Sequence, residues 1–549
     1  MNYNVLIGGA AGQGMKSLSN IISLSLKRHG YHVFMNTVYM SRIRGGHNYF
    51  QIRFSDKSVL NHSNTFDMIL ALNQETIDLH QDHLKGYILC DHTFSHDKKI
   101  DVPAKQTAKK LNHLKGENIV LLGAFVKAFN LDLNIFESVI KETFKNKTPE
   151  LNIKALALGY NSIDNYYATK EKTLDNAIII NGNTSIALGA ITAGLSVYSA
   201  YPMTPATSIM NYLLKTEKEA GFIVEQAEDE IAAIHIALGA SAAGVRSMTS
   251  SSGGGLSLMV EALGLTAITE TPLVIVDVMR PGPATGMATK TGQSDLSFLL
   301  TASQDEFPRM IIAVRDQEDA FYQTIRAFDL ADKYQMPVLI LNDQYLADAS
   351  KTIPKFDFDI KINRHLATEE MLDTPYKRYK FSETGISPRI IPGQFGRPVI
   401  SDNHEHNEYG EISEDPNNRV QMHLKRLKKL ETLKNELIEP KYIGPENTDM
   451  ILVGFGSTQG AIEEAVINLN QGGHKVSGMI FGDVYPLPTK LLEQHQDRKL
   501  INVEMNATGQ LSRLIRMETG ITFVDSILKF DGLQISGKDI EEVLYERHL

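Results

Sequence analysis

Short apolar runs alternate with amphipathic segments up to about residue 150. Runs of valine, isoleucine and leucine are separated by stretches with helical spacing, such as Ser17–Arg28. Apolar runs without polar alternation are typical of parallel strands covered on both faces. The pattern therefore predicts a parallel sheet with strands at Val5–Ile7, Val33–Met35, Met68–Leu72, Ile88–Cys90 and Ile119–Leu122.

The same alternation returns in two later parts of the chain. A helix predicted at 230–243 is rich in alanine and glycine, which lets a neighbouring backbone approach closely. A last segment, 447–549, begins with the apolar run Met450–Val453. In the middle segment, from about 177 to 350, strands are predicted at Ala177–Ile180, Val197–Ala200, Val245–Thr249, Leu273–Val278, Met310–Val314 and Val338–Leu341.

Two segments break the alternation. Residues 151–176 are polar and irregular, which predicts a linker. Residues 350–445 carry many charges and several prolines, and end in a charged helix from about Val420 to Leu437. Such an excursion is either an ordered functional loop or a linker. We therefore expect an α/β protein with three α/β domains, divided into 1–170 with the linker, 177–350, the excursion 351–445, and 446–549.

Composition narrows the class of protein. The 549 residues carry a formal net charge of −10, so no basic surface for nucleic acid is expected. No apolar run is long enough to span a membrane and no signal peptide is apparent, so we expect a cytoplasmic protein. The single cysteine, Cys90, is expected to be buried in a strand. One thiol excludes an iron–sulfur cluster held by this chain alone.

Two loops near the N-terminus could bind an anion. Gly8–Gly14 lies between a predicted strand and a helix, but its glycine order reverses the dinucleotide fingerprint. The next strand ends at Asn36, without a carboxylate for a ribose. Tight-turn packing or contact with another subunit is therefore favoured over NAD binding. Ser41–His47 is basic, and either a solvated turn or a site for an anionic group, such as a coenzyme A phosphate, is consistent with it.

An acidic patch in the middle segment suggests coenzyme chemistry. Glu230 opens the Ala/Gly helix beside Ile231 and Ala232. Thiamine diphosphate requires a carboxylate against N1′ of its aminopyrimidine ring, and a desolvated glutamate can share that proton. The alternative is that Glu225, Glu228, Asp229 and Glu230 are helix-start carboxylates favoured by the helix dipole.

Two further side chains follow predicted strands. Thr204 stands in Tyr201–Pro205, where prolines fix its hydroxyl for a substrate oxygen, although it could instead cap the next helix. Arg280 ends a buried strand and can hold a carboxylate by two hydrogen bonds, although a surface salt bridge is the alternative. The ends of neighbouring parallel strands line the ligand crevice of an α/β sheet.

The loop Thr249–Gly255 could be a ligand loop, because it offers backbone N–H groups at a helix start. A mobile glycine turn is the alternative. His404 and His406 resemble half a metal site, but no further ligand cluster is apparent. We expect no metal on this chain.

The order of these motifs resembles the 2-oxoacid:ferredoxin oxidoreductases, in the form of an α subunit with a γ-type domain fused at its N-terminus. Nearly the whole chain is covered. Small departures are Met203 for isoleucine, Ser252–Gly255 for Ser-Gly-Pro-Gly, and Gln293–Asp295 for Gln-Gly-Asp. The matching segments are Gly8–Gly14, Ser41–His47, Asn181–Asn183, Tyr201–Pro205, Glu228–Ala233, Thr249–Gly255, Arg280–Gly286, Glu405–Gly410, Ser413–Asp415, Tyr485–Pro488 and Val503–Gln510.

The resemblance implies a role for each candidate. Glu230 matches the glutamate at N1′, with Glu228 as a competitor, while Thr204 and Arg280 match the residues that hold the 2-oxoacid. Residues 177–350 would be the pyrimidine-binding domain and 446–549 a transketolase-C-like domain. The implied cofactor contacts are Tyr201, Pro202, Ser252, Gly253 and Glu230.

The resemblance also implies partners. The chain lacks the Gly-Asp-Gly anchor for a magnesium diphosphate, so a β subunit would hold Mg²⁺, the diphosphate and a [4Fe-4S] cluster, in an (αβ)2 assembly. The implied reaction is the oxidative decarboxylation of 2-oxoglutarate, or of a broad range of 2-oxoacids, with the acyl group passed to coenzyme A and electrons to ferredoxin. A pyruvate-specific member, or a non-catalytic or NAD-linked subunit, is the alternative.

Overall fold

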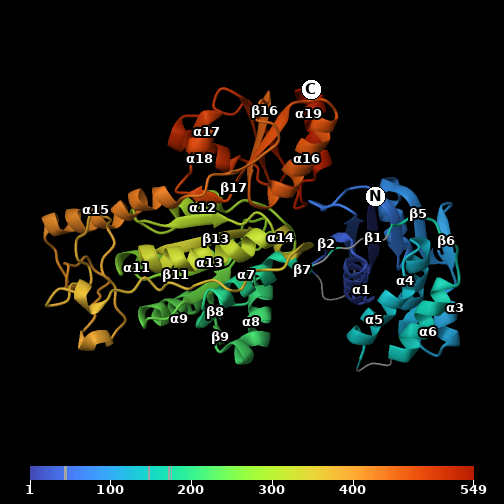
Figure 1. Ribbon diagram of the computed structural model, residues 1–549, viewed down its shortest axis with the longest axis horizontal. Coiled ribbons are helices and arrows are strands. Elements are labelled where there is room, and N and C mark those ends of the chain that lie inside the picture. The colour runs from blue at the N-terminus through green and yellow to red at the C-terminus, as the bar shows by residue number, and fades with distance from the viewer. Residues whose placement is uncertain (42–45, 146–148, 171–173, 175) are drawn as a thin grey trace. The chain divides into compact units, whose positions relative to one another are not determined.

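The computed structural model describes residues 1–41, 46–145, 149–170, 174 and 176–549 (Figure 1). These residues form an eight-stranded, a seven-stranded and a five-stranded sheet with helices packed against them, which confirms the predicted α/β class. The chain divides into two compact units. The first holds 1–181 with 348–355 and 536–539, and the second holds the remainder.

The sheet of the first unit is mixed, so the prediction of a wholly parallel sheet is wrong there. Its order is β6-β5-β4-β1-β3-β2-β14-β7. β1 (Asn2–Ala10), β4 (Phe66–Ala71), β5 (Leu84–Asp91) and β6 (Lys99–Val102) run parallel. The unpredicted β3 (His47–Ser55) lies antiparallel between β1 and β2 (His32–Val38). Only a short connection joins β2 to β3, which suits antiparallel neighbours.

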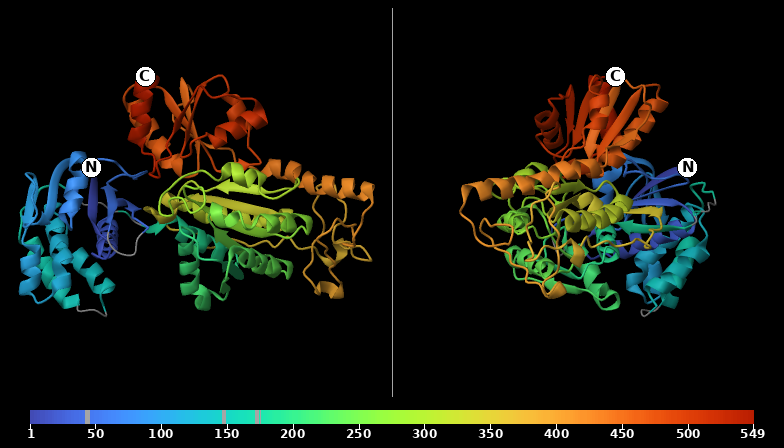
Figure 2. Two further views of the ribbon diagram at one scale, coloured as in Figure 1. Left: turned by 180° about the vertical axis from the view of Figure 1, so that it is seen from behind. Right: turned by 60° about the vertical axis from the view of Figure 1, so that its left-hand side comes forward.

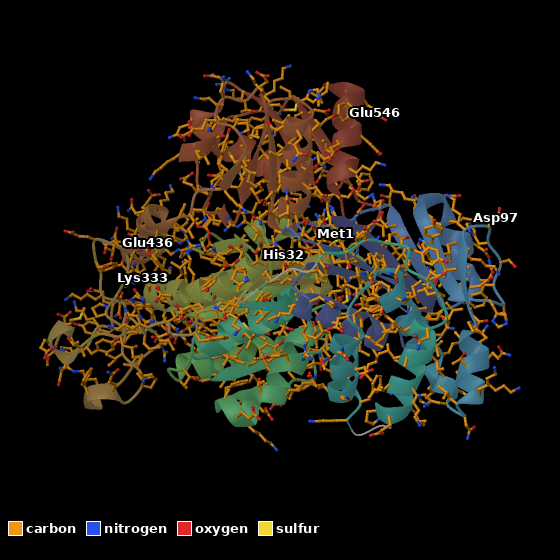
Figure 3. The ribbon with its side chains drawn as sticks, turned by 45° about the vertical axis from the view of Figure 1, so that its right-hand side comes forward. Met1, His32, Asp97, Lys333, Glu436 and Glu546 are labelled. Atoms are coloured by element: carbon orange, nitrogen blue, oxygen red, sulfur yellow. The ribbon has the colours of Figure 1, made fainter. Side chains whose placement is uncertain are left out.

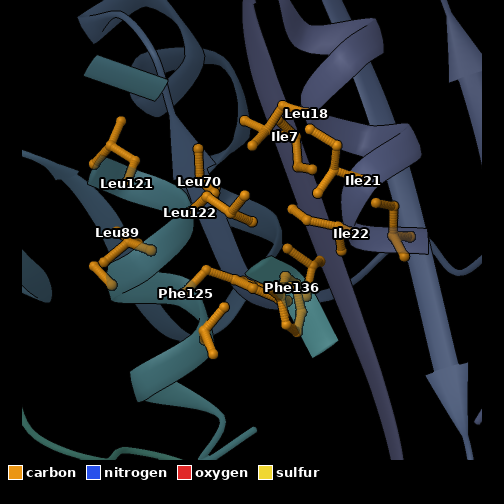
Figure 4. Close-up of a cluster of buried hydrophobic side chains, with 14 of the residues drawn as sticks. Ile7, Leu18, Ile21, Ile22, Leu70, Leu89, Leu121, Leu122, Phe125 and Phe136 are labelled. Atoms are coloured by element: carbon orange, nitrogen blue, oxygen red, sulfur yellow. The ribbon is translucent and has the colours of Figure 1, made fainter. Parts of the chain in front are cut away.

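Helix α4 (Glu117–Ala128) replaces a predicted strand. The run Ile119–Leu122 is buried on every side of this helix, and a short apolar run does not by itself distinguish a buried strand from a buried helix. In Figure 4, Leu121, Leu122 and Phe125 of α4 lie among side chains of β1, β4, β5 and α1. Cys90 is wholly buried in β5, as predicted.

The predicted linker at 151–176 is also partly wrong, because α6 (Pro149–Tyr160) occupies its first part. α6 packs tightly on α4, where a side chain on Gly123 or Gly159 would collide with the opposite backbone. The strand predicted at Ala177–Ile180 exists as β7 (Ala177–Asn181), but it pairs with β14 (Ser350–Pro354) in the first sheet. The other helices of this unit are α1 (Met15–Arg28), α2 (Gln74–His80), α3 (Ala104–Lys110) and α5 (Leu133–Thr143).

The seven-stranded sheet has the order β18-β12-β13-β11-β10-β8-β9. It is parallel except for β18 (Asp483–Tyr485), which runs antiparallel to β12. The predicted strands appear as β8 (Val197–Ala200), β10 (Ser247–Ser251), β11 (Leu273–Met279), β12 (Met310–Ala313) and β13 (Pro337–Asp343). The edge strand β9 (Ile223–Gln226) was not predicted.

Helices cover both faces of this sheet (Figures 1 and 2). α7 (Gly182–Thr192), α8 (Thr207–Ala220) and α13 (Gln317–Tyr334) pack with the side chains of one face. α9 (Glu230–Ala242), α11 (Val260–Ile268) and α12 (Leu296–Thr301) pack with those of the other. Two short helices, α10 (Gly253–Leu256) and α14 (Gln344–Asp348), follow β10 and β13.

Within the excursion, residues 356–415 form a largely irregular segment. It holds the short 3-10 helices Glu369–Met371 and Gln394–Gly396 and leads into α15 (Pro416–Leu433), close to the predicted charged helix. Buried ion pairs tie it down: the Asp332 carboxylate pairs with Arg246, Arg364 and Arg389. Figure 3 labels the two residues of a further, partly exposed ion pair at 2.5 Å, between Lys333 of α13 and Glu436, which follows α15.

The five-stranded sheet belongs to the second unit by its contacts. Its order is β15-β17-β16-β19-β20, and β15 (Lys441–Ile443) alone runs antiparallel to its neighbour. The other strands are β16 (Met450–Phe455), β17 (Val476–Phe481), β19 (Lys499–Glu504) and β20 (Asp525–Leu528). One face packs with α16 (Gln459–Gln471) and α19 (Gly537–Arg547), the other with α17 (Lys490–Gln494) and α18 (Gln510–Thr519). Among the described helices, none has the length and hydrophobicity to cross a bilayer.

Candidate functional site

Three of the candidate segments lie at the edge of the seven-stranded sheet that is formed by the carboxyl ends of its strands. Tyr201–Pro205 follows β8, Ser252–Gly255 follows β10, and Arg280 follows β11. These three strands are adjacent and parallel. Because the carboxyl ends of parallel strands meet at one edge of a sheet, the fold brings together segments that the sequence separates.

Glu230 is the first residue of α9 and lies close to this edge. The Asp229 side chain caps the helix, accepting from the Ala232 N–H at 2.7 Å. Glu230 is only 4% exposed, whereas Glu228 and Glu225 are exposed. Its Oε1 has no hydrogen-bond partner within the described chain. Burial therefore separates Glu230 from its competitor Glu228.

The Glu230 carboxylate packs against the glycine loop after β10. A Cβ placed on Gly255 would lie 2.7 Å from Glu230 Oε1 and would also collide with the Ser251 hydroxyl. Only glycine therefore fits here without moving Glu230. The loop is packed rather than a free glycine turn, because a Cβ placed on Gly253 would lie 2.5 Å from Asp295 Oδ2.

Buried hydroxyl groups are found in β10 and at Ser252, which follows it. Thr249, Ser251 and Ser252 are fully buried, and their hydroxyl oxygens make no hydrogen bond to any described residue. Ser250, one position out of step, points to the other face and lies 2.5 Å from the Tyr198 hydroxyl. Buried polar groups without partners are rare in native proteins and require an explanation.

Arg280 is 8% exposed, so the surface salt bridge is excluded. Its Nη1 donates to the Thr204 carbonyl at 2.6 Å and ties the end of β11 to the Tyr201–Pro205 turn. Burial lowers the pKa of the guanidinium, while the Asp295 carboxylate raises it. Thr204 does not cap α8, because Ala206 holds the N-cap position. Tyr201, by contrast, is 38% exposed.

Two buried carboxyl groups of this region were not among the predicted site residues. Asp277, within β11, is wholly buried, and burial with the charge of Asp295 raises its pKa well above the usual range. Asp295 follows the loop after Arg280, and burial raises its pKa to about 6. The signal was a carboxylate inside the otherwise apolar run Leu273–Met279, which a purely structural strand would not contain.

The C-terminal motif Val503–Gln510 holds the loop that carries Asp295. The Gln293 N–H donates to the Met505 carbonyl at 2.7 Å, and Asn506 Nδ2 donates to the Gln293 carbonyl at 3.0 Å. The buried Glu504 in turn accepts from the Leu511 N–H at 3.0 Å, at the start of α18. The five-stranded sheet therefore supports this edge of the seven-stranded sheet.

The N-terminal candidates belong to the first unit. Gly12 and Gly14 have positive φ in a tight turn before α1, and Gln13 Oε1 accepts from the Ala10 N–H at 2.6 Å. Of the basic loop Ser41–His47, residues 42–45 lie outside the described part of the chain. His47 begins β3, with its Nε2 2.8 Å from that of His80.

The histidines of the excursion have local partners. His404 Nδ1 lies 2.7 Å from Asp402 Oδ1, and the buried His406 has its Nδ1 3.0 Å from the His404 carbonyl. Among the residues that the structure describes, no group of three or more His, Cys, Asp or Glu side chains could hold a metal ion.

Two family models match the chain. Residues 4–162 match the pyruvate ferredoxin/flavodoxin oxidoreductase model, and residues 188–425 match the thiamine diphosphate-binding model of pyruvate flavodoxin/ferredoxin oxidoreductases. The second range contains Glu230, Thr204 and Arg280.

Individual relatives agree with the family models. The 2-oxoacid:ferredoxin oxidoreductase subunit alpha of Sulfolobus sp is 32% identical over 99% of this chain and 96% of its own length. The 2-oxoglutarate oxidoreductase subunit KorA of Mycobacterium tuberculosis is 32% identical over 79% of this chain and 68% of its own. Among solved structures, the 2-oxoglutarate:ferredoxin oxidoreductase of Magnetococcus marinus, with 2-oxoglutarate, coenzyme A and succinyl-CoA bound, matches at a TM-score of 0.94, with 32% identity over 99% of both chains.

Proposed function

Since the chain belongs to the 2-oxoacid:ferredoxin oxidoreductase family as an alpha subunit, we propose that its sheet edge binds the aminopyrimidine half of thiamine diphosphate and the 2-oxoacid. Glu230 is the residue on which this assignment depends. Its carboxylate is buried and one of its oxygens has no partner in the described structure, which a ligand with a proton to share would satisfy.

The residues around Glu230 fit the ring. Gly255 leaves the space beside the carboxylate open, where any side chain would fill it. The hydroxyls of Ser251 and Ser252 lie at the same strand end and are free to donate or accept. We assign Tyr201, Pro202, Ser252 and Gly253 as further contacts of the cofactor, on the strength of their position at this edge.

Glu230 would exchange a proton with N1′ of the bound aminopyrimidine. Thiamine diphosphate supplies the nucleophilic carbon and the electron sink for decarboxylation. General acid–base catalysis requires such a carboxyl group within hydrogen-bond reach of the proton that it exchanges.

Arg280 and Thr204 would hold the 2-oxoacid. The guanidinium is fixed by its hydrogen bond to the Thr204 carbonyl, which leaves other N–H groups for a carboxylate. Two parallel hydrogen bonds from arginine would orient the substrate and not merely attract it. The Thr204 hydroxyl, in the turn fixed by that bond, would contact the second substrate oxygen.

The remaining machinery is assigned to partners. We propose that a β subunit holds Mg²⁺, the diphosphate and a [4Fe-4S] cluster in an (αβ)2 heterotetramer, and that electrons leave to ferredoxin. The single, buried cysteine supports this division, because one thiolate does not hold a four-iron cluster. The same lone thiol suits a reducing compartment such as the cytoplasm.

The proposed domains follow the same family. Residues 1–170 would be the γ-type domain, 177–350 the pyrimidine-binding domain, 351–445 an insertion, and 446–549 the transketolase-C-like domain. We propose 2-oxoglutarate as substrate and coenzyme A as acyl acceptor. The support is the solved relative with both molecules bound, whose fold this chain shares at a TM-score of 0.94.

The test compares two neighbouring glutamates in the complex with the partner subunit. Replacing the buried Glu230 by Gln should lower coenzyme A-dependent oxidation of 2-oxoglutarate by about a hundred- to ten-thousandfold, because general acid–base catalysis is lost. Glu228→Gln, at an exposed position in the same patch, is the matched control and should retain activity. Full activity in Glu230→Gln with loss in Glu228→Gln would transfer the role to Glu228 and overturn the assignment.

A further inference from the structure

A buried asparagine holds the turn that carries Thr204. Asn183 lies in the first turn of α7 and is wholly buried. Its Nδ2 donates to the Pro205 carbonyl at 2.9 Å and to the Ser208 hydroxyl at 2.8 Å. The preceding carbonyl, that of Thr204, accepts from Arg280 at 2.6 Å. Two successive carbonyls of this turn are therefore held by side chains from other parts of the chain.

A second buried asparagine orients the first. Asn342, in β13, donates from its Nδ2 to Asn183 Oδ1 at 3.0 Å. A carboxamide accepts only at its oxygen and donates only at its nitrogen. The bond from Asn342 therefore fixes which end of the Asn183 side chain faces the Pro205 carbonyl. Asn342 lies in register with Val278 of β11, two residues before Arg280.

The elements that carry this network are closely packed. A Cβ on Gly182 would lie 2.5 Å from the Leu346 carbonyl, so glycine lets α7 begin directly against α14. Ala206 and Ile209, which follow the turn, are buried in the same core as Ile340 of β13. A side chain supported by packed helices and strands holds its partner more precisely than one on a free loop. Asn183 is thus suited to fix the position of the turn.

We propose that Asn183 is a positioning residue of the 2-oxoacid site, which fixes the Thr204 hydroxyl for the substrate by holding the Pro205 carbonyl. The inference rests on the proposed function, since Thr204 is assigned to the substrate there. Asn183 touches neither the substrate nor the cofactor and acts through the turn. Asn342 acts one step further away, by orienting the Asn183 carboxamide.

Removal of the Asn183 side chain should affect the 2-oxoacid and not coenzyme A. A misplacement of about 1 Å can cost up to about a hundredfold in rate. In the complex with the partner subunit, Asn183→Ala should therefore lower kcat/KM for 2-oxoglutarate roughly tenfold, through a higher KM. The KM for coenzyme A should stay unchanged. Ser208→Ala is the local control, because it keeps the bond to the Pro205 carbonyl and should retain kcat/KM.

A double-mutant cycle tests whether Asn183 acts through Thr204. Thr204→Ala should itself lower kcat/KM for 2-oxoglutarate. Adding Asn183→Ala should then cause no further loss, because the hydroxyl that Asn183 positions is already absent. A second loss as large as that in the wild-type background would overturn the inference and leave the substrate role of Thr204 intact. Full activity of Thr204→Ala would remove that role, and the inference with it.

An asparagine outside this network separates position from stability. Asn470 of α16 also donates to two backbone carbonyls, those of Val466 at 2.7 Å and Val476 at 2.6 Å. Asn470→Ala should lower the urea midpoint, because it leaves both carbonyls without this donor, but it should not change kcat/KM. A loss of kcat/KM as large as that of Asn183→Ala would show that the kinetics follow stability, and would overturn the inference.

A milder variant keeps the test decisive if Asn183→Ala does not fold. Asn342 Oδ1 has no hydrogen-bond partner among the residues that the structure describes. Asn342→Ala therefore removes one described side-chain hydrogen bond, the bond to Asn183 Oδ1. We expect kcat/KM for 2-oxoglutarate to fall roughly threefold, in keeping with one neutral hydrogen bond. A folded Asn342→Ala complex with the kcat/KM of the wild type would overturn the inference.

Discussion

The second unit contains two regions with buried polar groups. In one region these groups are paired within the chain, and in the other some of them are not. Between the seven-stranded sheet and α15, the fully buried Glu270 carboxylate pairs with Lys425 and Lys429, each at 2.6 Å. At the carboxyl ends of β10 and β11, buried oxygens of Glu230 and Ser251 have no partner in the described chain. We call the first region the ion cluster and the second the open edge.

This difference distinguishes the buried polar groups that are compensated within the protein from those that indicate a bound partner. An ion pair removed from water must be compensated within the protein, and the ion cluster is compensated by side chains distant in the sequence. An uncompensated buried oxygen costs stability, so its retention at the open edge indicates a bound partner that supplies the missing hydrogen bond. The two regions should therefore respond differently to substitution.

The largest effect on stability is expected at the ion cluster. Replacing Glu270 by Gln leaves two buried ammonium groups without a counter-charge, and should lower the free energy of unfolding by about 4 kcal/mol. Burial already lowers the pKa of Lys429 to about 7, despite the charge of Glu270. The urea midpoint followed by circular dichroism is the appropriate measurement, since the chain has no tryptophan.

An exposed pair provides the control. Glu431 and Lys434 form an ion pair at 3.0 Å with both side chains more than half exposed. Glu431→Gln should leave the urea midpoint unchanged, because water screens such pairs. Equal midpoints for Glu270→Gln and Glu431→Gln would remove the distinction between the ion cluster and an ordinary surface.

The next-largest effect is expected on the stability of the protein at low pH. Burial would raise the pKa of Glu405, but hydrogen bonds from Arg426 and Arg419 lower it from the usual 4.5 to about 2. A carboxyl group whose pKa is depressed by folding stabilises the protein above its unfolded pKa, and this stability is lost as the pH falls. About 3 kcal/mol should disappear between about pH 4.5 and 2.

The variant Glu405→Gln isolates this contribution. Its unfolding midpoint should fall below that of the wild type at pH 7, and the two should converge as the pH is lowered towards about 2. A difference that stays constant with pH would show that Glu405 stabilises the excursion by shape alone. In β11, at the open edge, the direction is opposite for Asp277, because burial raises the pKa of its carboxyl group.

Much of the sheet architecture could be predicted from sequence, because buried parallel strands such as Met310–Ala313 are uniformly apolar. The failures have a common cause. The run Ile119–Leu122 is equally apolar because α4 is buried on all sides, and the alternating β3 is identified only by its neighbours β1 and β2. The hydrophobic pattern of the sequence indicates which residues are buried. Whether a buried run forms a helix or a strand is decided by its tertiary contacts.

The residues of the candidate site also divide into those that the sequence predicts and those that only the tertiary structure brings to the site. Thr204, Glu230 and Arg280 could be proposed because each stands at the end or start of a predicted element. Asp295 could not, because its position against Gly253 depends on how the loop after β11 folds back. The hydrogen bond that fixes this loop joins Asn506 to Gln293, 213 residues apart. No local pattern contains that information.

A smaller effect, on activity, is expected when a side chain fills the space beside Glu230 at the open edge. In Gly255→Ala the new methyl group would lie 2.7 Å from Glu230 Oε1 and collide with the Ser251 hydroxyl. The carboxylate must move, so kcat/KM of the complex should fall about tenfold, or about 1.4 kcal/mol. The urea midpoint should change less than in Glu270→Gln. A large loss of stability with full activity would mean that the open edge is structural, like the ion cluster.

The smallest effect is expected within α9 itself, at Gly239. A Cβ there meets no atom within 4 Å, so Gly239→Ala adds a methyl group without a clash. Alanine favours a helix over glycine by about 0.5–1 kcal/mol, and the isolated chain should gain stability of that order. Urea unfolding of the isolated chain measures the gain, and Gly255→Ala in the same background shows that the two glycines of one region differ.

Gly239 lies in the Ala/Gly helix that begins at Glu230, so the complex adds a second measurement. If the exposed side of α9 is covered by the partner subunit, the same methyl group should weaken association while stabilising the free chain, whereas equal gains in both states would place that side in solvent.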